Sequence, residues 1–167
     1  MDAQWLTDEE SLAWRAVKSM VLQVPKALDA QMQRDSGITL FDYFVLSYLS
    51  MSPERTLRMS ELAAVTNGSL SRLSNVVKRQ EQRGWVTREP DPTDGRYTLA
   101  RLTDEGYAIV EAAAPGHVAA VRRYVIDPLT ASQQRVLVEV ADRLQRRRAA
   151  EGSRSPELAG PDAFEVP

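Results

Sequence analysis

Residues 60–106 of this 167-residue chain have the sequence SELAAVTNGSLSRLSNVVKRQEQRGWVTREPDPTDGRYTLARLTDEG. The patterns along this segment predict, in order, a short helix, a turn, a longer helix, two strands around a loop, and the start of another helix. The spacing of the apolar side chains indicates which face of each helix packs on a core.

The helix expected over residues 69–83, with Ser69 as its N-cap, has two chemically different faces. At about 100° of rotation per residue, four apolar side chains share one arc of about 120°, which predicts a face packed on a core. They belong to Leu70, Leu73, Val76 and Val77. The opposite arc holds no carboxylate and consists of Ser71, Arg72, Asn75, Lys78, Arg79 and Gln82. Such a face suits a DNA major groove, where Arg and Asn pair with base edges and Lys meets phosphate. A face that is only solvated is the alternative.

A β-hairpin is expected directly after this helix. Gly84 occupies the position of a left-handed helix cap, and residues 85–89 and 97–102 have strand composition. Two prolines and one glycine punctuate the loop at residues 90–96, which favours a projecting tip. Arg96, near this tip, is either an ordinary surface arginine or a cation for a narrow minor groove, whose negative potential favours guanidinium.

A short helix is expected upstream, over residues 59–66, with Leu62 and Val65 facing inward and Asn67-Gly68 as the following turn. With the basic helix and the hairpin, it predicts a winged helix-turn-helix unit over residues 55–102. Charge supports a nucleic-acid partner for this unit. Residues 55–101 carry nine Lys or Arg against five Asp or Glu, although the whole chain has a net charge of −2.

The chain resembles the MarR family of bacterial winged helix-turn-helix transcription regulators over about residues 5–148. The most specific shared pieces are Asp94-Gly95-Arg96 in the wing and Leu102-Thr103-Asp104-Glu105-Gly106 at the next junction. The resemblance implies a sequence-specific DNA-binding regulator, a ligand-responsive repressor, acting as a homodimer on a pseudo-palindromic operator in double-stranded DNA. Two recognition helices would enter successive major grooves, about one helical turn apart.

Eight residues are candidate DNA contacts. They are Ser69, Ser71, Arg72, Asn75, Lys78, Arg79, Asp94 and Arg96. Ser71, Arg72 and Asn75 are expected to contact base edges. Lys78 and Arg79 are expected to meet phosphate. Arg96 is expected in the flanking minor groove, and the resemblance implies that Asp94 holds or orients it. Asn75 stands where many relatives carry Arg, and Asn67-Gly68 replaces a more usual apolar pair, which indicates a distinct operator preference.

Amphipathic helices are expected on both sides of the winged unit. Residues 1–54 and 103–150 should form a helical dimerisation region, because so much apolar helix surface needs a second copy to cover it. An intramolecular bundle without a partner is the alternative. The predicted helix starts are Thr7, Thr39, Thr103 and Thr130. Pro25 is expected to bend or split the first helix, and a bend is expected at Pro115-Gly116. Residues 151–167 are expected to be a disordered tail. The predicted fold class is therefore mainly α, with a small β-hairpin wing.

An enzyme, a metal protein or a cofactor-dependent protein is not expected. The absence of cysteine excludes thiol catalysis and thiolate metal sites, and a single histidine, His117, leaves too few other ligands. No nucleophile motif is present. With no leader pattern and no apolar run near twenty residues, the chain is expected to be cytoplasmic and without a membrane partner.

A small aromatic or anionic effector is the remaining expected partner. The resemblance implies a crevice between the dimer helices and the winged unit, and the candidate lining residues are Trp14, Tyr43, Tyr48 and His117. Aromatic residues at helical spacing are more often part of a core. Two other functions stay open, namely a module that binds an acidic protein partner and a small-molecule-binding protein without specific DNA binding.

Overall fold

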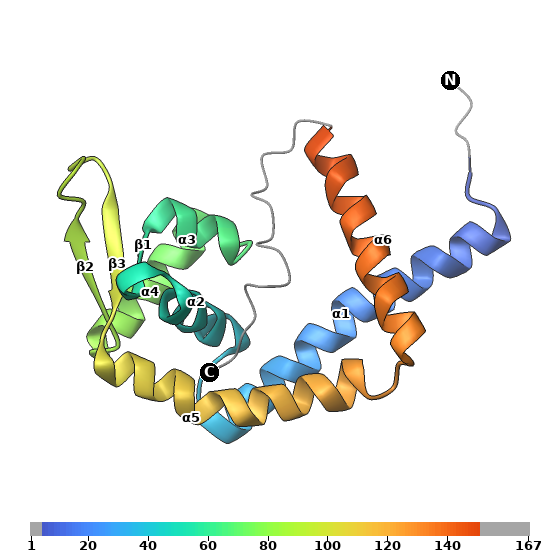
Figure 1. The fold of residues 1–167 in the computed structure, drawn as a ribbon, viewed down its shortest axis with the longest axis horizontal. Helices are drawn as coiled ribbons and strands as arrows, with labels where there is room; N and C mark the ends of the chain where they lie inside the picture. Colours follow the sequence, from blue (N-terminus) through green and yellow to red (C-terminus); the bar gives the residue numbers. More distant parts are fainter. Residues whose placement is uncertain (1–4, 151–167) are drawn as a thin grey trace.

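The computed structural model describes residues 5–150, and their fold is mainly helical with a small antiparallel sheet, as predicted (Figure 1). The predicted disordered tail at residues 151–167 lies outside the described residues. The elements are α1 (Asp8–Ser36), α2 (Leu40–Met51), a 3-10 turn (Pro53–Arg55), β1 (Thr56–Arg58), α3 (Met59–Val65), α4 (Leu70–Gln82), β2 (Val86–Pro90), β3 (Thr98–Leu102), α5 (Asp104–Val121), a π-helical turn (Arg122–Ile126) and α6 (Ala131–Ala150).

The predicted helix starts are confirmed by capping hydrogen bonds. Each capping hydroxyl accepts a hydrogen bond from a backbone N–H of the first turn, a group that has no partner within the helix. The capping residues are Thr7, Thr39, Ser69, Thr103 and Thr130. The helix α4 is followed by Gly84 at a φ of +76°, the left-handed conformation that was predicted for this position. The starts of these five helices are thus local properties of the sequence.

The sheet has one strand more than the predicted hairpin. β2 and β3 pair in antiparallel fashion, with Val86 opposite Leu102. The short strand β1 pairs with the other edge of β3 and places Leu57 opposite Ala100, so the strand order is β1-β3-β2. Three residues are too few to show the period-two alternation by which a strand is detected in a sequence.

The core lies between α2, α3, α4, α5, the sheet and the C-terminal half of α1. Leu73, Val76 and Val77 are buried there, as predicted for α4. Leu70 contradicts the prediction, because it is 56% exposed. It occupies the first turn of α4, and the buried stripe begins one turn later. Gln80 is buried in this stripe instead, at 1% exposure.

The predicted interruption of the first helix at Pro25 is not a split, because α1 continues as one helix from Asp8 to Ser36. The hydrogen bond that Pro25 cannot donate belongs to an exposed part of the helix, where water can satisfy the carbonyl of Val21. In Figure 1 the helices α2, α3 and α4 gather beside the sheet, while α6 and the N-terminal half of α1 extend away from it. Among residues 5–150, no helix is both long enough and apolar enough to span a bilayer.

Candidate nucleic-acid interface

Five of the six residues on the predicted polar face of α4 form two stripes with different surroundings, and the sixth, Gln82, is exposed at the end of the helix. Ser71, Asn75 and Lys78 form the first stripe, at spacings of four and three residues, and all three are exposed. Ser71 contacts the hydroxyl of Ser69 at 3.1 Å. Within the described part of the chain, no hydrogen bond or ion pair engages the side chains of Asn75 or Lys78. This stripe is available to a partner outside the chain.

The second stripe, Arg72 and Arg79, faces α2. The two arginines are seven residues apart, which places them about 20° from each other around the helix. The guanidinium of Arg72 lies over the ring of Phe41, 4.0 Å from its centroid. Arg79 donates from Nη2 to Oδ1 of Asp42 at 2.7 Å. The six residues that sequence analysis assigned to a single outward arc are therefore not equivalent.

The N-terminus of α4 favours negative charge. Its first turn contains no acidic residue, and Ser69 accepts a hydrogen bond from the backbone N–H of Arg72 at 3.2 Å. The only carboxylate of this helix, Glu81, pairs with Arg88 of β2 at 2.5 Å and is thereby neutralised. Unpaired backbone N–H groups at a helix start attract phosphate, so the geometry suits an anionic polymer.

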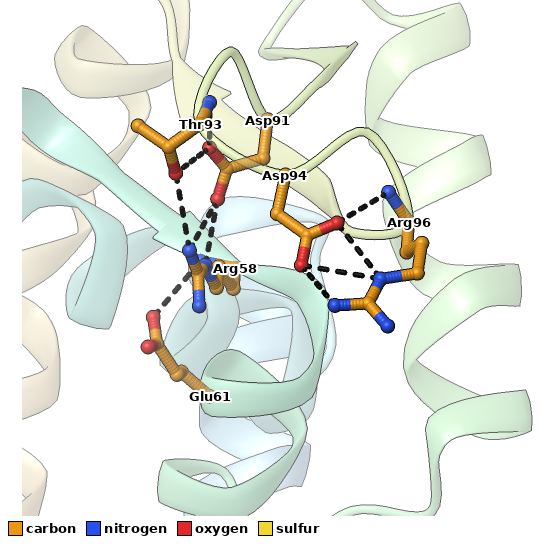
Figure 2. Close-up of polar contacts among 6 residues, drawn as sticks. All are labelled: Arg58, Glu61, Asp91, Thr93, Asp94 and Arg96. Atoms are coloured by element: carbon orange, nitrogen blue, oxygen red, sulfur yellow. Dashed lines mark hydrogen bonds and ion pairs between the residues drawn. The ribbon is translucent and has the colours of Figure 1, made fainter.

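The wing carries its cation outward. Arg96 is held by Asp94 in a two-pronged contact, with Nε to Oδ1 at 2.9 Å and Nη2 to Oδ2 at 2.6 Å (Figure 2). The Arg96 guanidinium lowers the pKa of Asp94, and the carboxylate raises the pKa of Arg96. The Arg96 side chain is nevertheless 84% exposed. It can therefore reach a ligand while its direction is restricted.

A second ion pair, which sequence analysis missed, fixes the base of the wing. Arg58, the last residue of β1, donates from Nε to the Asp91 carboxylate at 2.7 Å (Figure 2). Its guanidinium also stacks on the Tyr97 ring. Asp91 also accepts hydrogen bonds from the hydroxyl and the backbone N–H of Thr93, at 2.7 and 2.8 Å. These two bonds, with a smaller contribution from Arg58, lower the pKa of Asp91 to about 2. The sequence Asp91-Pro92-Thr93 is a signal for such a turn, but nothing local indicates its partner.

Two of the four candidate effector residues lie together. The rings of Tyr43 and His117 have centroids 4.6 Å apart, where α2 meets α5. Burial lowers the pKa of His117, and its Nδ1 is buried without a hydrogen-bond partner in the described structure. Trp14 is 57% exposed on the N-terminal half of α1, and Tyr48 packs against the core. In residues 5–150, no ring contact joins either of them to the Tyr43–His117 pair.

An open hollow of about 330 Å³ lies beside the Asp42–Arg79 ion pair, where the end of α1, the start of α2 and the end of α4 meet. Its lining includes Gln33, Thr39, Asp42, Arg79 and Arg83. None of the four aromatic candidates lines it, so this hollow is distinct from the predicted effector crevice.

Comparisons with known proteins relate this geometry to characterised relatives. The model of the MarR family matches residues 36–96. Sco3205, a MarR family transcriptional regulator from Streptomyces coelicolor solved in complex with DNA, is 45% identical, with a TM-score of 0.82 over 95% of this chain and 96% of that one. The HTH-type transcriptional repressor Rv2887 from Mycobacterium tuberculosis is 33% identical over 108 residues, 65% of this chain and 76% of the relative. CouR from Rhodococcus jostii RHA1, solved bound to p-coumaroyl-CoA, is 26% identical, with a TM-score of 0.65 over 86% of this chain and 94% of that one.

Proposed function

The chain belongs to the MarR family of transcriptional regulators, and we propose that it represses transcription by binding a pseudo-palindromic operator as a homodimer. The observation that carries this proposal is the exposed, carboxylate-free stripe of Ser71, Asn75 and Lys78, next to a helix N-terminus and flanked by the outward Arg96. An α-helix fits the major groove, and a projecting arginine fits the minor groove beside it.

The contacts follow from the positions of the side chains. Ser71 and Asn75 lie nearest the start of α4 and contact base edges, with Asn75 able to pair with adenine through both atoms of its amide. Lys78 contacts phosphate, as does the first turn capped by Ser69. Arg96 enters the minor groove, while Asp94 limits the directions that its guanidinium can take. Arg72, stacked on Phe41, can reach a base edge only by leaving or sliding along that ring.

The apolar surface of the long helices supports the homodimer. Exposed apolar side chains lie on the N-terminal part of the chain at Trp5, Leu6, Leu12, Trp14, Met20, Val21 and Leu22. A second set lies on α6, at Val136, Leu137, Val138, Val140 and Leu144. Patches of this extent are typical of interaction surfaces, and a second copy related by a two-fold axis would bury both sets. Residues 1–54 and 103–150 thus supply the dimerisation region, and residues 55–102 the DNA-binding unit.

An effector that binds between these regions would regulate the protein. The Tyr43–His117 pair is the best-supported part of such a site, because a buried unpaired nitrogen offers a ligand a hydrogen bond. A small aromatic or anionic molecule bound there would change DNA affinity only through its different affinities for the two arrangements of the winged units. The family consists of regulators, and we infer for this chain a cytoplasmic role without catalysis.

A binding titration tests the proposal. Purified protein is titrated against duplex DNA from upstream of its own coding region and against a scrambled duplex of equal length, at several salt concentrations. Saturable preference for the native duplex, weakening as salt rises, is the expected result. Two results together would contradict the proposal: equally weak binding to the native and the scrambled duplex, and no duplex from a random pool that binds more tightly than these.

A further inference from the structure

One turn of α2 contacts α4, the proposed recognition helix, at two residues. The ring of Phe41 lies beneath Arg72, and the adjacent carboxylate of Asp42 accepts a hydrogen bond from Arg79. Phe41 also lies so close to the turn before α4 that a Cβ at Gly68 would stand 2.8 Å from its ring. Phe41 therefore contacts the beginning of α4, and Asp42 contacts the same helix two turns further on, at Arg79.

Asp42 holds α4 through two separate groups. Its carboxylate Oδ1 accepts from Nη2 of Arg79 at 2.7 Å, and its backbone carbonyl accepts from Nε2 of Gln80 at 3.1 Å. The Asp42 side chain is 5% exposed and Gln80 is 1% exposed. Adjacent side chains on one helix, tied to one residue on another, restrict rotation of α4 about its own axis.

Asp42 is itself fixed from the other side. Its Oδ2 accepts hydrogen bonds from the backbone N–H of Thr39 at 3.1 Å and from the Thr39 hydroxyl at 2.5 Å. The backbone N–H of Leu40 donates to Asp29 of α1 at 2.8 Å, which anchors this turn to the first helix. Burial alone would raise the pKa of Asp42, but hydrogen bonds from Thr39 and Arg79 outweigh it, and the pKa is lowered. The carboxylate is therefore ionised at neutral pH.

The burial of Asp42 argues against a phosphate contact by Arg79. If Arg79 turned fully outward to meet phosphate, it would leave a buried carboxylate without its counter-charge, which is strongly unfavourable. An ion pair with phosphate at the exposed rim of an interface contributes much less free energy than the loss of this buried pair would cost. The Arg79 side chain is 46% exposed, so a phosphate contact made without leaving Asp42 is the alternative that the salt dependence of binding tests. Lys78, the preceding residue, has no such partner within the described structure and is free to make that contact.

We propose that Asp42 is a positioning residue that sets operator discrimination. Acting through Arg79 and Gln80, it fixes the rotation of α4 and hence the direction in which Ser71 and Asn75 meet base edges. Arg79, which the sequence suggested as a phosphate contact, then contributes orientation instead of charge neutralisation. This inference rests on the proposed DNA-binding function.

The salt dependence of binding separates the two roles of Arg79. A side chain that neutralises one phosphate contributes about 0.9 to the slope of log K against log salt concentration. Lys78→Ala serves as the matched control, because Lys78 is a neighbouring cation on the same helix. Because each copy of the homodimer carries one Lys78, it should reduce that slope by about 1.8, or about 0.9 per copy, and weaken operator and scrambled duplex equally. Arg79→Ala should leave the slope unchanged and reduce discrimination between the two duplexes by about fivefold or more.

Two further variants keep the test independent of folding. Asp42→Asn retains a side-chain oxygen for the Thr39 cap but removes the charge, and should reduce discrimination as Arg79→Ala does. Arg79→Lys keeps a cation beside Asp42 and should restore part of the discrimination. Because both residues act through one contact, Asp42→Asn combined with Arg79→Ala should be no worse than Arg79→Ala alone. Circular dichroism and thermal melting establish that each variant is folded.

The measurements use the full-length protein, an operator duplex selected from a random pool by the wild type, and a scrambled duplex. A smaller salt slope in Arg79→Ala with unchanged discrimination would overturn the inference and assign Arg79 to phosphate. Additive losses in the double variant would also overturn it. A wild-type protein that yields no selected operator would overturn the proposed function, and this inference with it.

Discussion

The winged unit buries apolar side chains in its core, whereas α6 and the N-terminal half of α1 expose theirs. Around α4 and the sheet, Leu62, Leu73 and Val77 are each 0% exposed. On α6, Leu137 is 40% exposed and Val140 is 45% exposed, and no α6 residue with described burial is buried. The first region has a complete core within one chain, whereas the second is incomplete until another surface covers it. A replacement on α6 should therefore disturb assembly while it leaves the core of the winged unit intact.

The largest expected effect comes from breaking the incomplete region. Replacing Leu137 and Val140 together with glutamate places charges in the proposed dimer interface, where their desolvation is unfavourable. We expect a monomer by analytical ultracentrifugation. Because two linked half-site contacts become one, operator affinity should fall roughly 100-fold or more. The double replacement Ser132→Glu and Gln145→Glu, at neutral polar positions of the same helix, adds the same two carboxylates and is the control. A dimer that survives the first replacement would refute this interface.

The next largest effect should arise in the winged unit, from Asn75→Ala. A good base contact contributes about 1–3 kcal/mol of discrimination, and this variant loses it while remaining dimeric. Competition titrations with operators changed at single positions measure the effect. Relaxed preference at one position in each half-site is expected, and full retention of discrimination would remove Asn75 from the set of base contacts.

A smaller loss is expected for Arg96→Ala in the wing. Its side chain is 84% exposed, so its removal leaves the fold intact and takes one cation from the minor groove. Operator affinity should weaken roughly tenfold, about 1.4 kcal/mol, in the range of a hydrogen bond to a charged group. Arg101→Ala, at a similarly polar position on β3, provides a comparison. Unchanged affinity of Arg96→Ala at moderate salt would exclude the wing from the mechanism.

The smallest expected effect is on stability and depends on pH. Burial lowers the pKa of His117 below its usual 6.5, so the folded state favours the neutral ring. Stability is therefore complete above pH 6.5 and declines as pH falls from there through the lowered pKa. His117→Phe should lose this part of the pH dependence of thermal melting, and since His117 is the only histidine, no other histidine can mask the change. Equal pH profiles for both proteins would contradict the assigned burial effect.

Local features of the fold were predictable, and features that depend on distant partners were not. The caps at Ser69 and Thr103 and the left-handed Gly84 follow from a few adjacent residues. The Arg58–Asp91 and Arg79–Asp42 pairs join residues 33 and 37 positions apart, so no local pattern reveals them. The helical periodicity of α4 identified its polar face correctly, but it could not show that α2 lies against the stripe of Arg72 and Arg79.

The same limit applies to the effector residues. The family resemblance and aromatic character selected Trp14, Tyr43, Tyr48 and His117, and neither can distinguish a helix junction from an exposed surface. The structure brings Tyr43 and His117 together and leaves Trp14 among the exposed apolar residues of α1. The assignment of these residues to a ligand site stays a prediction.

Selection of binding sites from a random duplex pool tests the central claim most directly, with wild type and Asn75→Ala selected in parallel. A complete winged unit in each copy, joined by the long helices, predicts that the wild type enriches a two-fold symmetric motif. Its half-sites should lie about one helical turn apart, and Asn75→Ala should lose preference at one symmetric pair of positions. Failure of the wild type to enrich any motif, or enrichment of a single unpaired half-site, would contradict the account.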